Sequence, residues 1–383
     1  MKRVLAIAGA AVLMLSVAPP SSAAGDDEPT GQCAPPAKTV IPQESWAQKR
    51  IAADRVWPLT TGSGVVGVID TGVAAGAQSL NGAVLPGTDL RGGKGDGDCY
   101  GRGTFIAGLI AARPGTGPFV GVAPGSRIYP VRVSDDPPKI QDHAGLSRDI
   151  GQGIKSAVDG GATVVAVGLQ ATIGTPELQQ AVEYAAAKDA VVIAPAVVPK
   201  QGQLAFPARL PGVVSVAPLT AGGPVTNQPY GADPSVAAPA GDLVSVAPEG
   251  TGNRAGSGTE LAVGYVAGTA ALIRTYHPTL SAAQVRDRLL RTADHPSARL
   301  PDKYVGYGVV DPYAAVSTVL DNDAPVRPAA EQLPITLPKE RDPEPGNRAM
   351  LFAGIAGAVA LLIAGPAVIA AAEKKKRKAA KST

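Results

Sequence analysis

The sequence predicts an α/β body built on a doubly wound, mostly parallel sheet, with an export signal before it and one transmembrane helix after it. Two observations predict the body: short β-branched runs apolar enough to be strands buried on both faces, and helical patterns that alternate with them. Such alternation favours right-handed crossover connections between parallel strands. The third observation is a long apolar segment close to the C-terminus.

Residues 1–24 have the layout of a secretory signal peptide. Lys2 and Arg3 come before an apolar run over residues 4–17, and small residues follow that run. A buried N-terminal helix is the alternative interpretation. The signal predicts export of the chain, with residues 25–45 as an N-terminal arm in front of the body.

Residues 349–372 form an uncharged, mostly apolar segment that is long enough to cross a lipid bilayer. A helix rises about 1.5 Å per residue, so this segment exceeds the roughly 30 Å of the hydrocarbon core. Pro366 lies within it, which membrane helices tolerate. The tail, residues 373–383, carries six Lys and Arg residues, and the positive-inside rule therefore places the C-terminus in the cytoplasm and the body outside. A DNA-binding tail is the alternative interpretation.

Composition and charge limit the class of protein. The 383 residues include 35 basic and 32 acidic side chains, and 45% are hydrophobic, which excludes a disordered chain, a collagen and a cysteine-stapled miniprotein. The net charge of +3 comes from the two ends of the chain and indicates no nucleic-acid partner. Residues 321–348, rich in proline and charge, predict a linker to the membrane helix. The remaining residues 46–320 suffice for one large domain or two small ones.

Four runs in the body have the composition of buried strands. Asp70 closes the first run, and ligand sites in open parallel sheets collect at the carboxyl ends of strands. The four runs are Val65–Asp70, Arg127–Val133, Thr163–Val167 and Ala190–Ala196.

Two apolar stripes at helical spacing lie between these strands. Thr175 and Pro176 are typical of a helix start, as the N-cap and a first-turn residue, and the second stripe follows them. The stripes are Leu146, Ile150, Ile154 and Val158 for the first helix, and Leu178, Ala181, Val182, Ala185 and Ala186 for the second.

Cys33 and Cys99 are the only cysteines in the chain. In an exported protein the economical interpretation is a single disulfide, which would tie the N-terminal arm to a loop of the body. Two free thiols are the alternative.

Three segments of the body resemble the catalytic motifs of subtilisin-like serine proteases. VVGVIDTGV at 65–73 resembles the aspartate motif, and GRGTFIAGLIAA at 101–112 resembles the histidine motif HGTxVAGxIA. GTELAVGYVAGTAALIR at 258–274 resembles the serine motif GTSxAxPxVAGxxAL. The order of the three motifs is the subtilisin order. The resemblance implies a subtilisin-like fold for the body.

Further features resemble mycosins, which are membrane-anchored subtilases associated with type VII secretion in actinobacteria. They are WAQKRIAADRVWPLTTGSGV at 46–65, a cysteine just before the second motif, GYGVVDPYAAV at 306–316, and the signal, linker and single C-terminal anchor. The resemblance covers nearly the whole chain. It implies membrane proteins of a type VII secretion complex as partners.

The chemical positions depart from the family pattern. Asp70 stands where the family has its aspartate, but Arg102 occupies the histidine position and Glu260 the serine position. In the segment VVIAPAVV, Val198 aligns with the asparagine that serves the oxyanion hole. The resemblance therefore implies a degenerate site in which only the aspartate is retained.

These substitutions predict a pseudoprotease. Subtilase catalysis needs a hydroxyl nucleophile, a base that takes its proton, a carboxylate that orients the base, and oxyanion donors. Arg102 cannot be the base, because a guanidinium has a pKa above about 12 and no acceptor lone pair. Ser257 and Thr259 lie close to Glu260 in sequence, but a shift of one position turns a side chain away from the site. We therefore predict no useful hydrolysis.

The three histidines, His143, His277 and His295, lie outside the motifs and are interpreted as solvated surface residues. Their spacing predicts no metal site, and nothing in the sequence resembles a phosphate loop or a nicotinamide site. The sequence therefore predicts neither a metal nor a cofactor.

The substituted residues also support a hypothesis about the old catalytic site. If the fold is kept, Asp70, Arg102 and Glu260 converge, and a guanidinium between two carboxylates can make charge-assisted contacts with both. Glu260 would lie near the N-terminus of the helix in its motif, where the helix dipole favours negative charge. The alternative is that these positions are under relaxed selection and the side chains never meet.

Three functional classes remain. The favoured one is a non-catalytic scaffold that is displayed outside the membrane and binds other proteins of a type VII secretion machine. The second is a peptide-binding module that holds extended peptides without cutting them. The third is an active serine endopeptidase with a divergent site.

Overall fold

The computed structural model describes most of the body and little outside it. The chain divides into two units, Met1–Val326 and Arg327–Thr383, and the first holds the α/β body. The described residues are 33–115, 117–135, 141–296 and 299–320, with the single positions 362 and 366.

Several predicted segments lie outside the described residues. They are the signal peptide, the linker, the basic tail, and all of the predicted membrane span except Leu362 and Pro366. Among the residues that are described, no helix is both long enough and apolar enough to cross a bilayer.

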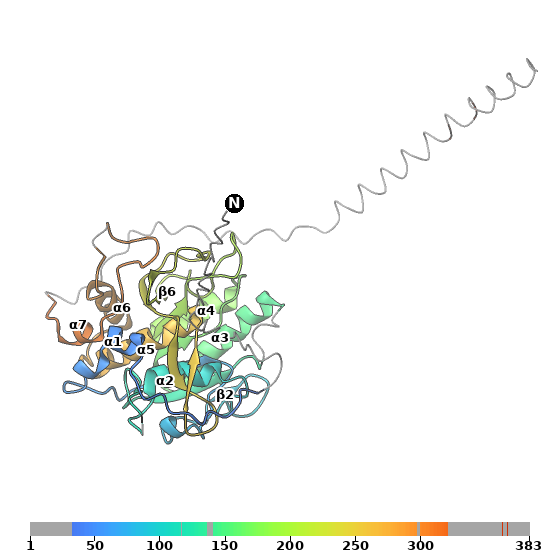
Figure 1. Ribbon diagram of the computed structural model, residues 1–383. Coiled ribbons are helices and arrows are strands. Elements are labelled where there is room, and N and C mark those ends of the chain that lie inside the picture. The colour runs from blue at the N-terminus through green and yellow to red at the C-terminus, as the bar shows by residue number, and fades with distance from the viewer. Residues whose placement is uncertain are drawn as a thin grey trace, which may run out of the picture. The chain divides into compact units, whose positions relative to one another are not determined.

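An eight-stranded sheet forms the centre of the body (Figure 1). Its strand order is β2-β3-β1-β4-β5-β6-β7, with β8 also paired to β6, and every pairing is parallel except β6 with β7. The predicted mostly parallel sheet is thus confirmed. The strands are β1 Val65–Asp70, β2 Thr88–Asp89, β3 Arg127–Arg132, β4 Ala162–Val167, β5 Val191–Pro195, β6 Val214–Thr220, β7 Gly223–Pro224 and β8 Val236–Pro239. A separate antiparallel hairpin joins β9 Leu243–Val246 to β10 Asn253–Gly256.

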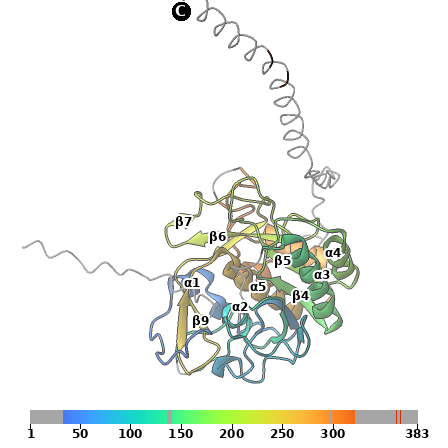
Figure 2. The same cartoon turned by 90° about the vertical axis from the view of Figure 1, so that its right-hand side faces the viewer.

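Helices cover both faces of the sheet (Figure 2). One core cluster holds α2, α5, α6 and α7 against alternate strand residues such as Val66 and Val68. A second holds α3 and α4 against the residues that point the other way, such as Val65 and Ile69. The helices are α1 Trp46–Ile51, α2 Arg102–Ala111, α3 His143–Asp159, α4 Pro176–Ala187, α5 Ala262–Tyr276, α6 Ala282–Arg291 and α7 Pro312–Ser317.

The strand and helix patterns locate the main elements to within a few residues. All four predicted strands are present, and α4 begins as predicted, with the Thr175 hydroxyl accepting a hydrogen bond from the Leu178 N–H. Two stripe residues differ from expectation: Val158 is only partly buried and Ala186 is exposed. Each lies near the C-terminal end of its helix, where the apolar stripe no longer faces the core.

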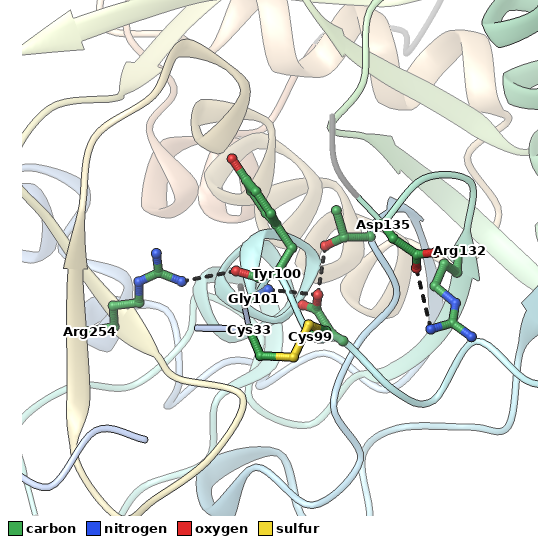
Figure 3. The surroundings of a disulfide bond; sticks show 9 residues. Cys33, Cys99, Tyr100, Gly101, Arg132, Asp135 and Arg254 are labelled. Carbon is green, nitrogen blue, oxygen red and sulfur yellow. Dashed lines mark hydrogen bonds and ion pairs between the residues drawn. A yellow bond between two sulfur atoms is a disulfide. The ribbon is translucent and has the colours of Figure 1, made fainter. Parts of the chain in front are cut away.

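The predicted disulfide between Cys33 and Cys99 is present and ties the arm to the loop before α2 (Figure 3). The arm then runs beside the β9–β10 hairpin, where Ala37 N–H donates to Glu249 O at 2.9 Å and Gly252 N–H donates to Ala37 O at 2.9 Å. On the other side of the disulfide loop, Arg254 Nη1 donates to Tyr100 O at 3.3 Å. The arm and the start of α2 are therefore held as one packed region.

Replacing both cysteines with serine is expected to lower the free energy of unfolding by about 2–4 kcal/mol. The bridge closes a loop with a sequence separation of 66 residues, and removing it returns that loop-closure entropy to the unfolded chain. Chemical denaturation of the double variant and of the reduced wild-type chain measures the loss. Equal midpoints for oxidised and reduced wild type would contradict the expectation.

Candidate functional site

Asp70 and Arg102 form a buried ion pair at the carboxyl end of β1. Asp70 is 0% exposed, and its Oδ1 accepts a hydrogen bond from the Thr71 N–H at 2.8 Å. Arg102, the first residue of α2, donates from Nε to Asp70 Oδ1 at 3.0 Å and to Oδ2 at 3.1 Å. Both carboxylate oxygens are thereby engaged by one guanidinium N–H.

Glycines let the backbone come close enough for this contact. Gly101 precedes α2 with φ of 87°, a left-handed conformation that suits glycine. A Cβ on Gly103 would lie 2.0 Å from Gly72 O, and one on Gly168 would lie 2.2 Å from Asp70 Oδ2. The glycine at 103 therefore permits α2 to approach β1, and the glycine at 168 leaves room for the Asp70 carboxylate.

Glu260 joins the pair more loosely. It lies in the short 3-10 turn Thr259–Leu261 that precedes α5, and its Oε1 is 4.0 Å from Arg102 Nη1. Its Oε2 is 3.5 Å from the Thr259 hydroxyl, and its side chain is 27% exposed. Glu260 does not cap α5, because the helix has no side-chain cap. The structure thus brings together the three residues of the hypothesis, with the partial exposure of Glu260 giving them contact with solvent.

The electrostatics of the cluster keep Arg102 charged. Burial lowers the pKa of Arg102, whereas the negative charges of Asp70 and Glu260 raise it. Together they raise the pKa by more than burial lowers it, so it lies above its ordinary value. One cation and two anions leave the cluster with a net charge of −1. Arg102 Nη2 is buried and has no hydrogen-bond partner among the described residues.

Val198 contributes no polar group to the cluster. It follows β5, is 2% exposed, and packs in the α3 and α4 core cluster. Its backbone N–H donates to Pro229 O at 3.0 Å. A Cβ on Gly231 would lie 2.5 Å from Val198 Cγ1, which shows how closely the side chain is enclosed.

Asp98 is a further residue of the site that sequence reasoning missed. It is 7% exposed and accepts four hydrogen bonds: Oδ1 from the Thr71 hydroxyl at 2.8 Å and the Gly101 N–H at 2.7 Å, and Oδ2 from the Thr104 N–H at 2.8 Å and hydroxyl at 2.6 Å. It therefore links the start of α2 to the residue after Asp70. Its position four residues before the start of α2, within the motif at 101–112, is the signal that could have indicated this role.

Burial raises the pKa of Asp98 from 3.8 to about 6, although its hydrogen bonds oppose the rise. The folded chain therefore takes up this proton at a higher pH than the unfolded chain, and the Asp98 contribution to stability grows as the pH falls from about 7 to about 4. Over this pH range the free energy of unfolding should rise by up to roughly 3 kcal/mol through Asp98, and Asp98→Asn should abolish this pH-dependent rise. Denaturation midpoints of both proteins across this pH range test it, with Asp233→Asn at an exposed site as the control. A pH-independent difference between wild type and D98N would contradict the prediction.

The neighbouring hydroxyls do not replace the missing nucleophile. The Ser257 hydroxyl accepts a hydrogen bond from the Asp242 N–H at 2.9 Å, and the Thr259 hydroxyl faces Glu260. Within the described ranges, no histidine hydrogen-bonds to either hydroxyl. Neither hydroxyl therefore has an imidazole base beside it.

The histidines are less exposed than predicted. His295 is exposed, but His143 and His277 are partly buried, because His277 Nε2 contacts Val316 O at 2.9 Å and His143 Nδ1 is enclosed without a partner in the described structure. In the part of the chain that is described, no three His, Cys, Asp or Glu side chains are grouped to hold a metal ion.

Comparison with known proteins places these features in a family. The profile of the subtilase family matches residues 62–308. Mycosin-4 of Mycobacterium tuberculosis is 34% identical over 376 residues, which cover 85% of this chain and 80% of the relative.

Solved structures of mycosins and of a secretion complex are also similar to this chain. The crystal structure of MycP1 from Mycobacterium smegmatis aligns with a TM-score of 0.67 and 30% identity, covering 77% of this chain and 90% of that one. A chain of an intact ESX-5 inner membrane complex aligns with a TM-score of 0.66 and 27% identity, covering 89% and 94%.

Proposed function

The chain belongs to the subtilase family and is a homologue of mycosins, and we propose that it is a proteolytically inactive member that acts as a scaffold or binding component of a type VII secretion system. In this proposal the signal peptide exports the body, and the C-terminal apolar segment anchors it in the cell membrane by a single pass. The basic tail then remains in the cytoplasm. The homologous chain in an ESX-5 inner membrane complex supports the association with secretion machinery.

The observation that carries the proposed inactivity is the contact between Arg102 and both oxygens of Asp70, at 3.0 and 3.1 Å. In an active subtilase that carboxylate orients the imidazole base. Here it binds a guanidinium, which stays protonated and has no lone pair that could accept the proton of a nucleophile. Loss of the triad in subtilisin costs about 10⁶-fold in turnover, and loss of one oxyanion donor about 10²- to 10³-fold.

Two measurements on the detergent-solubilised full chain test the proposal. A fluorophosphonate probe labels an activated serine, and we expect no labelling of this chain beside strong labelling of a mycosin with intact motifs. Affinity purification from native membranes should recover membrane proteins of the secretion complex. Covalent labelling would overturn the inactivity, and purification of the chain without such proteins would overturn the scaffold role.

Binding to extended peptides is the competing outcome. If a peptide panel binds saturably and remains uncut while no secretion protein co-purifies, the chain is a peptide-binding module instead of a scaffold.

A further inference from the structure

A polar cavity of about 170 Å³ lies between the N-terminal arm, the β9–β10 hairpin and the loop that follows α2. Neither Asp70 nor Arg102 nor Glu260 lines it, so it is separate from the cluster at the old catalytic position. With about 30 Å³ for each water molecule, the cavity has room for about six waters or for one compact polar ligand. Its polar wall is formed by Gln78, Ser79, Arg113, Thr251 and Asn253.

Backbone hydrogen bonds hold the walls of this cavity together. Asn253 N–H donates to Thr39 O at 2.9 Å, which joins the hairpin to the arm. Arg113 N–H donates to Ser79 O at 2.8 Å, which joins the loop after α2 to the 3-10 turn Gln78–Leu80. Because the backbone of these walls is in place before a ligand arrives, binding loses little backbone entropy.

Arg113 carries the one charge among the described residues that line the cavity. Its Nη1 donates to Asn81 O at 2.8 Å and its Nη2 to Gly82 O at 3.4 Å, so the guanidinium is positioned by neutral carbonyl groups. It forms no ion pair within the described ranges. A guanidinium has five N–H donors and no acceptor, so donors beyond these two are available to a ligand.

The side chain of Asn253 has only donors left for a ligand. Its Oδ1 accepts a hydrogen bond from the Ile41 N–H at 3.1 Å, which fixes the orientation of the amide and leaves the two N–H groups of Nδ2. The hydroxyls of Ser79 and Thr251 can donate as well. A neutral polyol would need acceptors for its own hydroxyls, whereas an oxyanion needs only donors. A donor-rich wall with one positive charge therefore favours an oxyanion.

We propose that the cavity lined by these five polar residues, here termed the arm cavity, binds a phosphoryl group, with Arg113 and Asn253 Nδ2 donating to its oxygens. A phosphoryl group has at least three acceptor oxygens in a tetrahedral arrangement, which suits donors from three separate segments of the chain. A carboxylate accepts its donors in one plane. Free phosphate and the phosphate of a lipid headgroup share this chemistry. The inference does not depend on the scaffold role.

The first test uses inorganic phosphate and the detergent-solubilised full chain. We expect phosphate to raise the unfolding midpoint saturably and beyond the effect of sodium chloride at equal ionic strength, because a ligand that binds only the folded chain stabilises it. Arg113→Gln should weaken the apparent affinity at least tenfold. Arg148→Gln, which removes a charge that is 52% exposed on α3, is the matched control and should leave the affinity unchanged.

Asn253→Asp separates ligand binding from the folding of the arm. The variant keeps an acceptor oxygen for the Ile41 N–H, so its unfolding midpoint without phosphate should stay close to that of wild type. It replaces the Nδ2 donor with a carboxylate oxygen, which repels an anion, and phosphate binding should be lost. Asn227→Asp adds the same charge at an exposed position and should bind phosphate as wild type does.

Three results would overturn this assignment: no effect of phosphate beyond that of sodium chloride, equal affinities in R113Q and R148Q, or phosphate binding by N253D that matches N227D. Glycerophosphoglycerol, the soluble headgroup of phosphatidylglycerol, identifies the source of the phosphoryl group. Competition with phosphate at similar concentrations assigns the arm cavity to a headgroup ester, and binding of phosphate without such competition assigns it to free phosphate. Co-purification of secretion proteins decides the scaffold role independently of these measurements.

Discussion

Arg102→Met is expected to lower the free energy of unfolding by about 3–5 kcal/mol. The substitution leaves the Asp70 carboxylate, which is 0% exposed, without the cation that engages both its oxygens. Among the residues that the structure describes, only the Thr71 N–H would still donate to it, and an uncompensated buried charge is among the most costly changes in a protein interior. Chemical denaturation of the two proteins at neutral pH measures the loss.

A double-mutant cycle separates the ion pair from the other packing of Arg102. Asp70→Asn combined with R102M should be less destabilised than the sum of the single variants, by about 1–3 kcal/mol. Arg148→Met is the control, because its contact with Asp142 is 4.0 Å long and exposed and should change stability by less than about 1 kcal/mol. Additive effects of D70N and R102M would show that the pair contributes no coupling.

The strands that could be predicted are the ones whose composition leaves little choice. β1, β4 and β5 are largely apolar runs at the centre of a parallel sheet, buried by helices on both faces, and β3 beside β1 keeps an apolar pair of buried residues, Ile128 and Val131. β6 and β8 were not among the predicted strands; each contains a proline, Pro218 or Pro239, but the predicted β3 contains Pro130 as well, so proline alone does not explain the omission. β2 and β7 have two residues each and carry no periodic signal.

The candidate site shows a similar division. Motif order and residue chemistry were enough to predict that Asp70, Arg102 and Glu260 come together, because three motifs of one fold fix three backbone positions. The sequence could not predict the unequal contacts of Arg102. Its Nε donates to both carboxylate oxygens of Asp70, whereas its Nη1 lies 4.0 Å from Glu260 Oε1. Asp98 was missed because its role depends on a tertiary contact with Thr71, which lies 27 residues earlier.

The geometry argues that the cluster is structural, whatever its history. Arg102 is held by its strongest contact at the end of β1, and the network around Asp98 fixes the turn from which it projects. The disulfide constrains the same turn through Cys99. A side chain held in this way links the start of α2 to the central sheet.

Single reversions toward the family pattern are expected to give no proteolysis. Arg102→His supplies a base but no nucleophile, and Glu260→Ser supplies a nucleophile beside a guanidinium that accepts no proton. Val198→Asn puts an amide into an enclosed apolar site. Fluorophosphonate labelling and a fluorogenic peptide assay should not distinguish these variants from wild type, because the triad acts as a unit.

The combined variants carry the largest expected change in activity. R102H with E260S restores the triad residues, but without an oxyanion donor its turnover should remain about 10²- to 10³-fold below that of an active mycosin. Adding V198N should recover little of that deficit, because the Val198 side chain is 2% exposed and packs in the α3 and α4 core cluster. The loop after β5 would have to turn before the amide could meet an oxyanion. Full activity in the triple variant would mean that this loop is free to turn, and labelling of R102H alone at the level of an active mycosin would mean that a nearby hydroxyl already serves as the nucleophile.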